Sequence, residues 1–155
     1  MKKYYFLISI FSLLFSFTSC SSDDSELPPN EILSSKIWVI KSKVISPSIV
    51  YYGQEITDIS LFESEETKNY SFEFLADGTF YQYDSAGELL FENTWYLNAD
   101  HTQLTFGEPI VYEYPVVGNM GFTTIDIISI SSSKIVGVID ASFNEVDYEV
   151  TLTFI

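Results

Sequence analysis

The chain has 155 residues, enough for one ordinary domain, and its 22 acidic residues outnumber its seven basic ones to give a net charge of −15. All seven basic residues are lysines, so the chain lacks the arginine fork that binds phosphates, and so negative a surface excludes nucleic-acid partners. One Cys and one His are too few for a structural zinc site, a disulfide framework or a Cys–His catalytic pair.

Residues 1–19 have the pattern of a secretory signal peptide. Lys2 and Lys3 give it a positive start, and the apolar run over residues 4–17 would span about 21 Å as a helix, less than a hydrocarbon core of about 30 Å. The run ends in FTSC, which resembles the lipobox of bacterial lipoproteins. That resemblance implies cleavage before Cys20 and acylation of Cys20, so that membrane lipid anchors the protein in the cell envelope. Ordinary signal cleavage beside an incidental thiol is the alternative.

The segment over residues 20–31 is predicted to be a flexible, lipidated tether. It is acidic and proline-containing, and it holds too few apolar side chains to offset the entropy cost of ordering. Its acidic run resembles the surface-export signals of some Gram-negative lipoproteins, which implies the outer membrane and exposure at the cell surface. A plain solvated spacer explains the run equally well. The folded domain is therefore expected over residues 32–155.

Period-two alternation dominates residues 32–155, without a heptad pattern or an internal repeat. Near the C-terminus, Val150, Leu152 and Phe154 would lie on one face of a strand and the intervening threonines on the other. The same alternation predicts strands at 36–45, 70–76, 79–84, 88–97, 102–106, 110–116, 122–130, 134–141 and 146–154.

Turn signals separate these strands. Asp77-Gly78 is a strong hairpin signal because Gly tolerates positive φ, and residues 85–87, 98–100 and 118–121 are further turn signals. Tight turns between short strands predict an all-β protein, an antiparallel meander of about eight main strands. Closure into a β-barrel would remove two exposed sheet edges, and a two-sheet β-sandwich is the competing architecture.

One long connection, residues 46–69, interrupts the meander. It contains a short predicted strand and one or two predicted helical turns, and it carries Tyr51, Tyr52, Ile59 and Phe62, more apolar groups than a solvated loop keeps. We expect these four residues to form a ligand-binding site that covers one mouth of the barrel and controls entry to its cavity. A tolerated surface insertion is the alternative.

Three motifs resemble the family of bacterial lipocalin-like lipoproteins. FLADGTF over residues 74–80 is similar to the F-x-x-D-G-T-F hairpin of that family, and NTWYL over residues 93–97 to its G-x-W-x-L segment, with Asn93 in place of the glycine. Residues 125–136 are similar to the closing hairpin, and Leu33 and Trp38 fall near the opening L-x-G-x-W. The resemblance implies a lipocalin-like β-barrel, and an eight-stranded barrel has room for one small ligand at most.

The chemistry-bearing side chains do not form a catalytic or metal-binding pattern, so we predict neither catalytic residues nor a metal or cofactor. His101 lies in a predicted turn with no nucleophile beside it. The acids at 145, 147 and 149 alternate outward along a strand, about 7 Å apart, as on a solvated face. The acids at 63, 65 and 66 lack the spacing of an EF-hand loop.

The roles of the aromatic residues and of one short motif can each be interpreted in two ways. Trp38, Trp95, Phe72 and Phe74 are expected to pack in the core, although aromatic faces also stack on sugars. The sequence DSA over residues 84–86 resembles the acceptor of a bacterial O-glycosylation system, which would modify Ser85, and an Asx-type turn explains it equally well.

Three classes of function remain. The favoured one is a membrane-anchored, non-enzymatic binding module for a small apolar or sugar-like ligand. The second is a protein-interaction or structural lipoprotein of the envelope, such as an inhibitor-like barrel or an accessory subunit. A hydrolase comes last because no nucleophile, base and orienting group stand together in the pattern.

Overall fold

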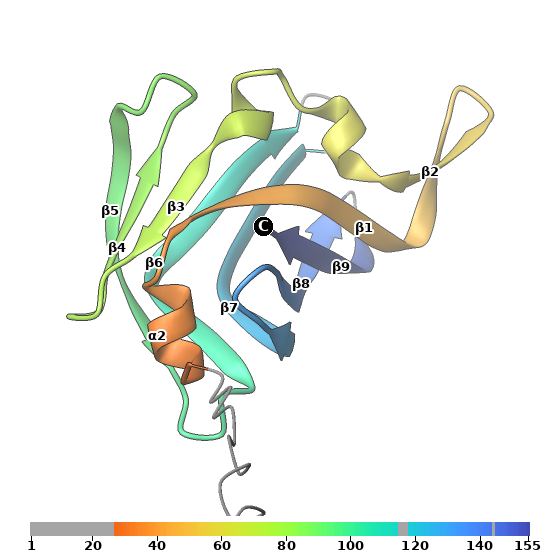
Figure 1. Cartoon of the computed structure of the whole chain (residues 1–155). Helices are drawn as coiled ribbons and strands as arrows, with labels where there is room; N and C mark the ends of the chain where they lie inside the picture. The colour runs from red at the N-terminus through yellow and green to blue at the C-terminus, as the bar shows by residue number, and fades with distance from the viewer. Residues whose placement is uncertain (1–26, 115–117, 144) are drawn as a thin grey trace, which may run out of the picture.

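The computed structural model describes residues 27–114, 118–143 and 145–155, which form an all-β fold around one continuous sheet (Figure 1). The predicted signal peptide, Cys20 and most of the predicted tether lie outside the described residues. The strands are β1 (Ile37–Tyr51), β2 (Gln54–Asp58), β3 (Ser71–Phe74), β4 (Thr79–Tyr83), β5 (Leu89–Leu97), β6 (Gln103–Tyr114), β7 (Gly118–Ile130), β8 (Ile135–Phe143) and β9 (Val146–Phe154). The helices are α2 (Pro29–Leu33) and two 3-10 helices between β2 and β3, η1 (Ile59–Phe62) and η2 (Thr67–Asn69).

The sheet closes into an antiparallel barrel. Its nine described strands follow the order β2-β1-β3-β4-β5-β6-β7-β8-β9, and a further pairing of β1 with β9 joins the two sides. The long strand β1 makes this closure: it pairs first with β3, then with β9 and at its far end with β2. Eight of the described strands therefore form the barrel, and β2 is an extra strand in a hairpin that projects from it (Figure 1). The predicted barrel is confirmed and the sandwich alternative is wrong.

Two boundaries differ from the sequence-based expectation. The predicted strands 102–106 and 110–116 belong to one strand, β6, whose pairing with β7 shifts register between Thr105 and Ile110. The turn predicted at residues 118–121 is wrong, because those residues begin β7 and pair with the end of β6. Met120 is buried there, so the position that a turn would leave in solvent belongs to the core.

Aromatic and aliphatic side chains fill the barrel. Trp38, Phe72 and Phe74 are buried as predicted, and Trp95 is half-buried against them with its Nε1 donating to the Leu75 carbonyl at 2.9 Å. A cavity among the core side chains around Phe72, Phe80 and Phe106 measures about 10 Å³. A space of that size is at the lower limit for a single water molecule.

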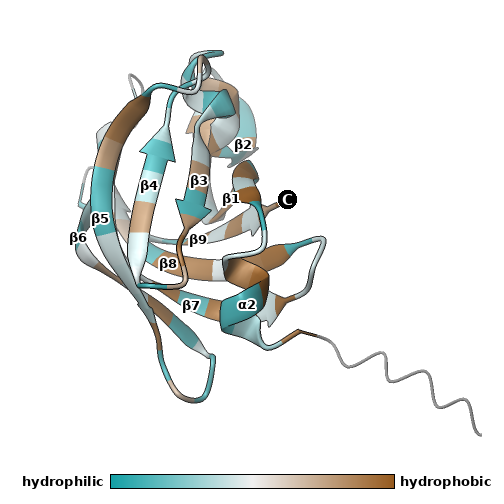
Figure 2. Ribbon diagram, turned by 60° about the vertical axis from the view of Figure 1, so that its left-hand side comes forward, coloured by the Kyte–Doolittle hydropathy of each residue, from teal (hydrophilic) through white to brown (hydrophobic). Residues whose placement is uncertain are grey.

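Helix α2 covers one end of the barrel and η1 packs against the other (Figures 1 and 2). In α2, Ile32 and Leu33 are buried, and the Leu33 carbonyl accepts a 2.8 Å hydrogen bond from Nε1 of Trp38. This helix begins at Pro29, within the segment predicted to be tether. In η1, Ile59 is fully buried, which stabilises the fold by about 1.5–3 kcal/mol.

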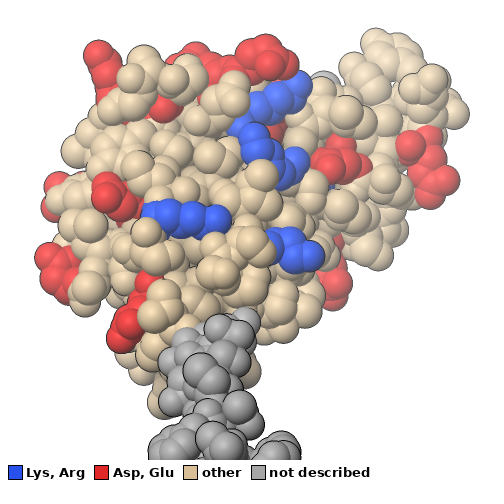
Figure 3. Space-filling model, in the orientation of Figure 1, with Lys and Arg blue, Asp and Glu red and all other residues tan. Residues whose placement is uncertain are grey.

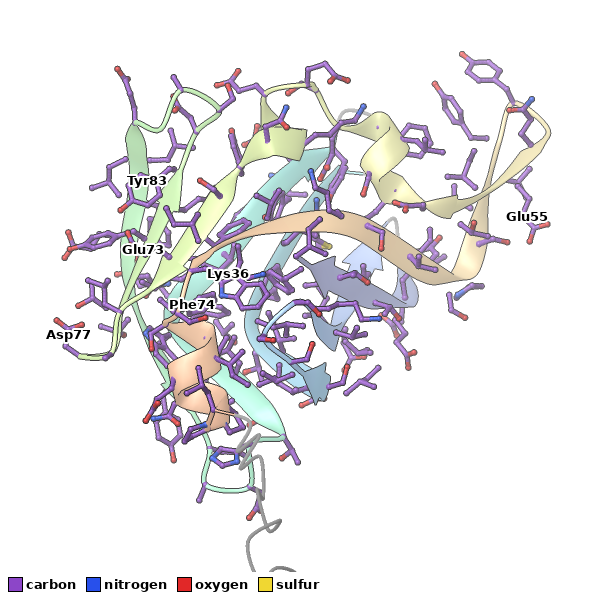
Figure 4. All side chains as sticks on the ribbon, in the orientation of Figure 1. Lys36, Glu55, Glu73, Phe74, Asp77 and Tyr83 are labelled. Atoms are coloured by element: carbon purple, nitrogen blue, oxygen red, sulfur yellow. The ribbon has the colours of Figure 1, made fainter. Side chains whose placement is uncertain are left out.

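The predicted Asp77-Gly78 hairpin is present between β3 and β4. Gly78 has φ +90°, and Asp77 Oδ1 accepts a 2.9 Å hydrogen bond from the Thr79 amide, which lowers the pKa of Asp77. Asp77 lies at the tip of this turn (Figure 4). On the neighbouring strands, Tyr83 donates a 2.6 Å hydrogen bond to Glu73, which raises the pKa of Tyr83 to about 12 (Figure 4).

Candidate functional site

The described barrel strands β5 and β6 separate along part of their length. Their pairing covers three positions, Trp95, Tyr96 and Leu97 of β5, opposite residues 104–106 of β6. Beyond that point, residues 89–94 of β5 pair with β4, and residues 110–114 of β6 pair with β7. The two strands are neighbours in the sheet, so their divergence opens a fork in the barrel wall.

Asn93 holds the base of this fork. Its side chain, on a residue only 7% exposed, donates from Nδ2 to the Glu108 carbonyl at 2.8 Å and accepts at Oδ1 from the amides of Glu108 and Thr94, at 3.0 and 2.8 Å. The amide group of this side chain thus takes the place of a peptide group in the ladder. Gly107 allows the close approach, because a β-carbon there would collide with the Thr94 hydroxyl. Pro109 follows, a residue found in strands at bulges and edges because it has no N–H to donate.

A cleft of about 730 Å³ lies between the separated strands. Its lining combines aromatic rings, hydroxyl and amide groups, and one carboxylate. The lining residues come from β5 (Leu90, Phe91), β6 (Pro109, Val111, Tyr112, Glu113, Tyr114), the η1–β3 segment (Ser64, Thr67, Tyr70), Gln82 of β4 and Asn119 of β7. A mixed lining of this kind is typical of a binding site, in which apolar surface supplies area and a few polar groups supply orientation.

A buried ion pair lies beside the cleft. Lys43 Nζ is 2.7 Å from Oε1 of Glu63, and both side chains are 1% exposed. Glu63 Oε1 also accepts a 2.9 Å hydrogen bond from the Tyr114 hydroxyl, and Lys43 Nζ lies 4.8 Å from the centre of the Tyr112 ring. The pair therefore fixes the end of η1 to two tyrosines of β6 that line the cleft.

Burial shifts the pKa values of three groups in this cluster. It lowers the pKa of Lys43, against the opposing effect of the nearby Glu63 carboxylate. It raises the pKa of Tyr114 and of Tyr112, and Glu63 raises both further. The Tyr112 hydroxyl is buried without a hydrogen-bond partner among the described residues. Such a group costs about 1–3 kcal/mol, so this tyrosine is the one lining residue with an unmet polar requirement inside the barrel.

The four sequence-predicted ligand residues do not line this cleft. Tyr51, Tyr52 and Phe62 form an aromatic cluster where the β1–β2 hairpin meets η1, with the Tyr51 ring centre 4.5 Å from that of Tyr52 and 5.2 Å from that of Phe62. Tyr52 is 90% exposed, whereas Ile59 is fully buried in the core. The hairpin carries Glu55 at its far side, away from the barrel (Figure 4).

The other candidate residues lie on the surface. His101 is exposed in the β5–β6 turn with φ +57°, and the acids at 145, 147 and 149 are exposed, as on a solvated face. Asp84 Oδ1 accepts from the amides of Ala86 and Glu88, both at 2.8 Å, so an Asx-type turn holds the exposed Ser85. Among the described residues, no group of three or more His, Cys, Asp or Glu side chains is placed to hold a metal ion.

Comparison with known proteins adds nothing to these observations. Neither a protein-family model nor a curated protein matches the chain. Within the part of the chain that the structure describes, no helix is long and apolar enough to cross a membrane.

Proposed function

We propose that the protein is a membrane-anchored, non-enzymatic binding module whose ligand occupies the cleft between β5 and β6. The observation that carries the proposal is the contrast between a cavity of about 10 Å³ among the aromatic core side chains and a cleft of about 730 Å³ between β5 and β6. A ligand needs volume and a few convergent polar groups, and the cleft has both.

The lining of the cleft bears on the class of ligand. A purely apolar ligand would leave the polar groups of Ser64, Thr67, Gln82 and Asn119 without partners, which is unfavourable once water is displaced. A sugar-like ligand would satisfy them and would stack on Tyr70 or Phe91. Of the two small-ligand classes predicted from the sequence, the sugar-like one is therefore the better supported.

The membrane anchor is proposed from the FTSC motif and Cys20, which would place the protein in the envelope, at the outer membrane and with exposure at the cell surface. The arrangement of the described residues is compatible with this. Helix α2, the described element nearest to Cys20 in the sequence, lies at the barrel end opposite to η1 and η2 (Figure 1). The cleft is lined from the η1–β3 side, so it would face away from the anchored end.

A protein-interaction module is the second candidate, because the fork exposes two strand edges rather than only side chains. Native mass spectrometry of the full chain, isolated in detergent from its own host, tests the proposal of a binding module. Retained ligand that Glu113→Lys abolishes would support the cleft as the site. Loss of a retained ligand on substitution at Tyr52, with no effect at Glu113, would move the site to the projecting hairpin and overturn the proposal.

A further inference from the structure

We infer that the ligand of this cleft is an extended, basic segment of another polypeptide, which adds as a strand in the gap between β5 and β6. The inference rests on the proposed function only in that it takes the cleft as the binding site, and it assigns that site to a polypeptide in place of a small sugar-like ligand. Strand addition to an exposed sheet edge is a general mode of peptide recognition in which backbone hydrogen bonds supply affinity and side-chain pockets supply specificity.

Two facing strand edges are present in the described part of the barrel. Residues 89–94 of β5 have β4 on one side and residues 110–113 of β6 have β7 on one side, and the opposite side of each faces the cleft. Unpaired strand edges are templates for a further strand. Residues 89–93 would accept about five residues of an extended chain, a length of about 17 Å.

The fork is held open by specific contacts, which distinguishes it from a frayed edge. Asn93 occupies the hydrogen-bonding groups of Glu108 at the base, and Pro109 removes an N–H from β6 at the next position. Strands β5 and β6 therefore cannot extend their present hydrogen-bonded ladder beyond this point. The edges above it stay available to a strand that comes from outside.

Apolar side chains border the gap where an added strand would place its own. Leu89 and Leu90 of β5 are 53% and 47% exposed, and Val111 of β6 is 54% exposed. In Figure 2 the end of β5 beside β4 has the colour of hydrophobic residues. Alternate side chains of an added strand would cover these residues, and a small ligand would leave most of them in water.

Charge defines the chemistry of the segment. Glu113 lines the cleft, and Glu92 and Glu108 are exposed on the two strands that border it. The lining residues that the structure describes include no lysine, and the chain contains no arginine. In the view of Figure 3, acidic side chains lie along the left-hand edge of the molecule and lysines lie nearer its centre. A segment that alternates Lys or Arg with apolar residues would match both the acids and the apolar border.

The test measures binding of a fluorescein-labelled ten-residue peptide of alternating Lys and Val to the full chain in detergent, by fluorescence anisotropy. A second peptide of the same sequence carries N-methyl groups on alternate residues, which keeps the charge but blocks hydrogen bonding along one edge. Glu113→Lys alters the border of the cleft. Glu149→Lys, an exposed acid on β9, makes the same change in net charge elsewhere and is the matched control.

We expect Glu113→Lys and N-methylation each to weaken binding about tenfold or more and Glu149→Lys to weaken it less than twofold. Amide hydrogen exchange should slow at residues 89–93 and 110–113 when the unmodified peptide binds. Equal binding of the two peptides, or equal effects of the two substitutions, would mean that general electrostatic attraction is responsible and would overturn the inference. If an oligosaccharide mixture instead slows amide exchange around the cleft, and Glu113→Lys abolishes that effect, the inference is wrong and the proposed function stands. If neither probe affects the cleft, both are wrong.

Discussion

Glu63→Gln removes the negative charge that compensates Lys43 inside the barrel. The two charged groups are 2.7 Å apart and their side chains are 1% exposed, so the remaining ammonium group would stay in a site that water does not reach. Removing one partner of a buried pair costs about 3–5 kcal/mol. Because domains of this size unfold with free energies of about 5–15 kcal/mol, the variant should lose a large fraction of its stability. Lys43→Met should cost a similar amount, although Glu63 keeps the Tyr114 hydroxyl as a donor.

The double variant Lys43→Met/Glu63→Leu separates two possible roles of the pair. Replacing both members of a buried ion pair by apolar side chains is often neutral or stabilising. We therefore expect the double variant to unfold within about 1–2 kcal/mol of the unsubstituted protein, far less than the sum of the single losses. The charges would then serve to fix where η1 docks, and not to raise net stability.

Urea unfolding followed by tryptophan fluorescence measures these differences, since Trp38 is fully buried and reports loss of the core. The reasoning would be refuted by a loss below about 1 kcal/mol in Glu63→Gln, which would mean that the ammonium group finds water or another acceptor. It would also be refuted by a double variant as unstable as the sum of its parts. In that case the network would be stabilising in itself.

Three further predictions concern a turn, a tyrosine and the anchor. Gly78→Val should cost about 1–2 kcal/mol because φ is +90° there, and should lower Tm by several degrees in calorimetry. Gly53 has a similar φ of +76° but lies in the projecting hairpin, so Gly53→Val should lower Tm less. Equal shifts in Tm for the two variants would contradict this prediction. The pKa of Tyr83 is raised to about 12 by Glu73, so its contribution to stability is complete below about pH 10 and is lost as pH rises through 12. Glu73→Gln should return that pKa toward 10 in an NMR titration of ¹³C-labelled tyrosine, and an unchanged value would show that the carboxylate is not the cause. Cys20→Ala should release soluble protein or leave an uncleaved precursor in cell fractionation, because stable attachment needs several acyl chains; a processed variant that stays with the membrane would disprove the anchor.

Much of the fold could be predicted from local patterns. Alternation placed Phe72, Phe74, Val150 and Leu152 in the core because each strand has one buried face, and a single strand contains enough information to show it. Tight turns and the cost of leaving edges exposed favoured closure into a barrel, but the alternation did not exclude a sandwich. The continuity of β6 did not follow, because the exposed residues 107–109 interrupt the alternation, although Phe106 and Ile110 on either side of them are buried on the same face.

The site could not be predicted, for a related reason. Lys43 lies inward because the pairing of β1 with β9 shifts register between Ile40 and Ser42, so simple alternation from Trp38 puts it on the wrong face. Glu63 stood in an acidic cluster typical of a surface, and only its contact with Lys43 explains its burial. Asn93 was visible as a departure from a glycine in the family motif. Its role depends on backbone groups of Glu108, 15 residues away, which no local pattern contains.

The aromatic side chains that fill the interior of this barrel also bear on why the gap in its wall matters. Eight strands enclose a space just wide enough for side chains, and here phenylalanine and tyrosine rings among the described residues pack into it around a cavity of only about 10 Å³. The proposed recognition of a ligand then uses the wall, where side chains alone give a shallow surface. Separating two strands of the wall leaves backbone hydrogen-bonding groups unpaired, which is unfavourable. A barrel with such a gap therefore needs contacts that stop the separation from extending along the strands. Asn93 makes such contacts, since its side chain is hydrogen-bonded to Glu108 where the β5–β6 ladder ends, and Gly107 leaves room for this side chain. The fork is therefore an interruption of the sheet that specific contacts hold open, and acidic and apolar side chains border it.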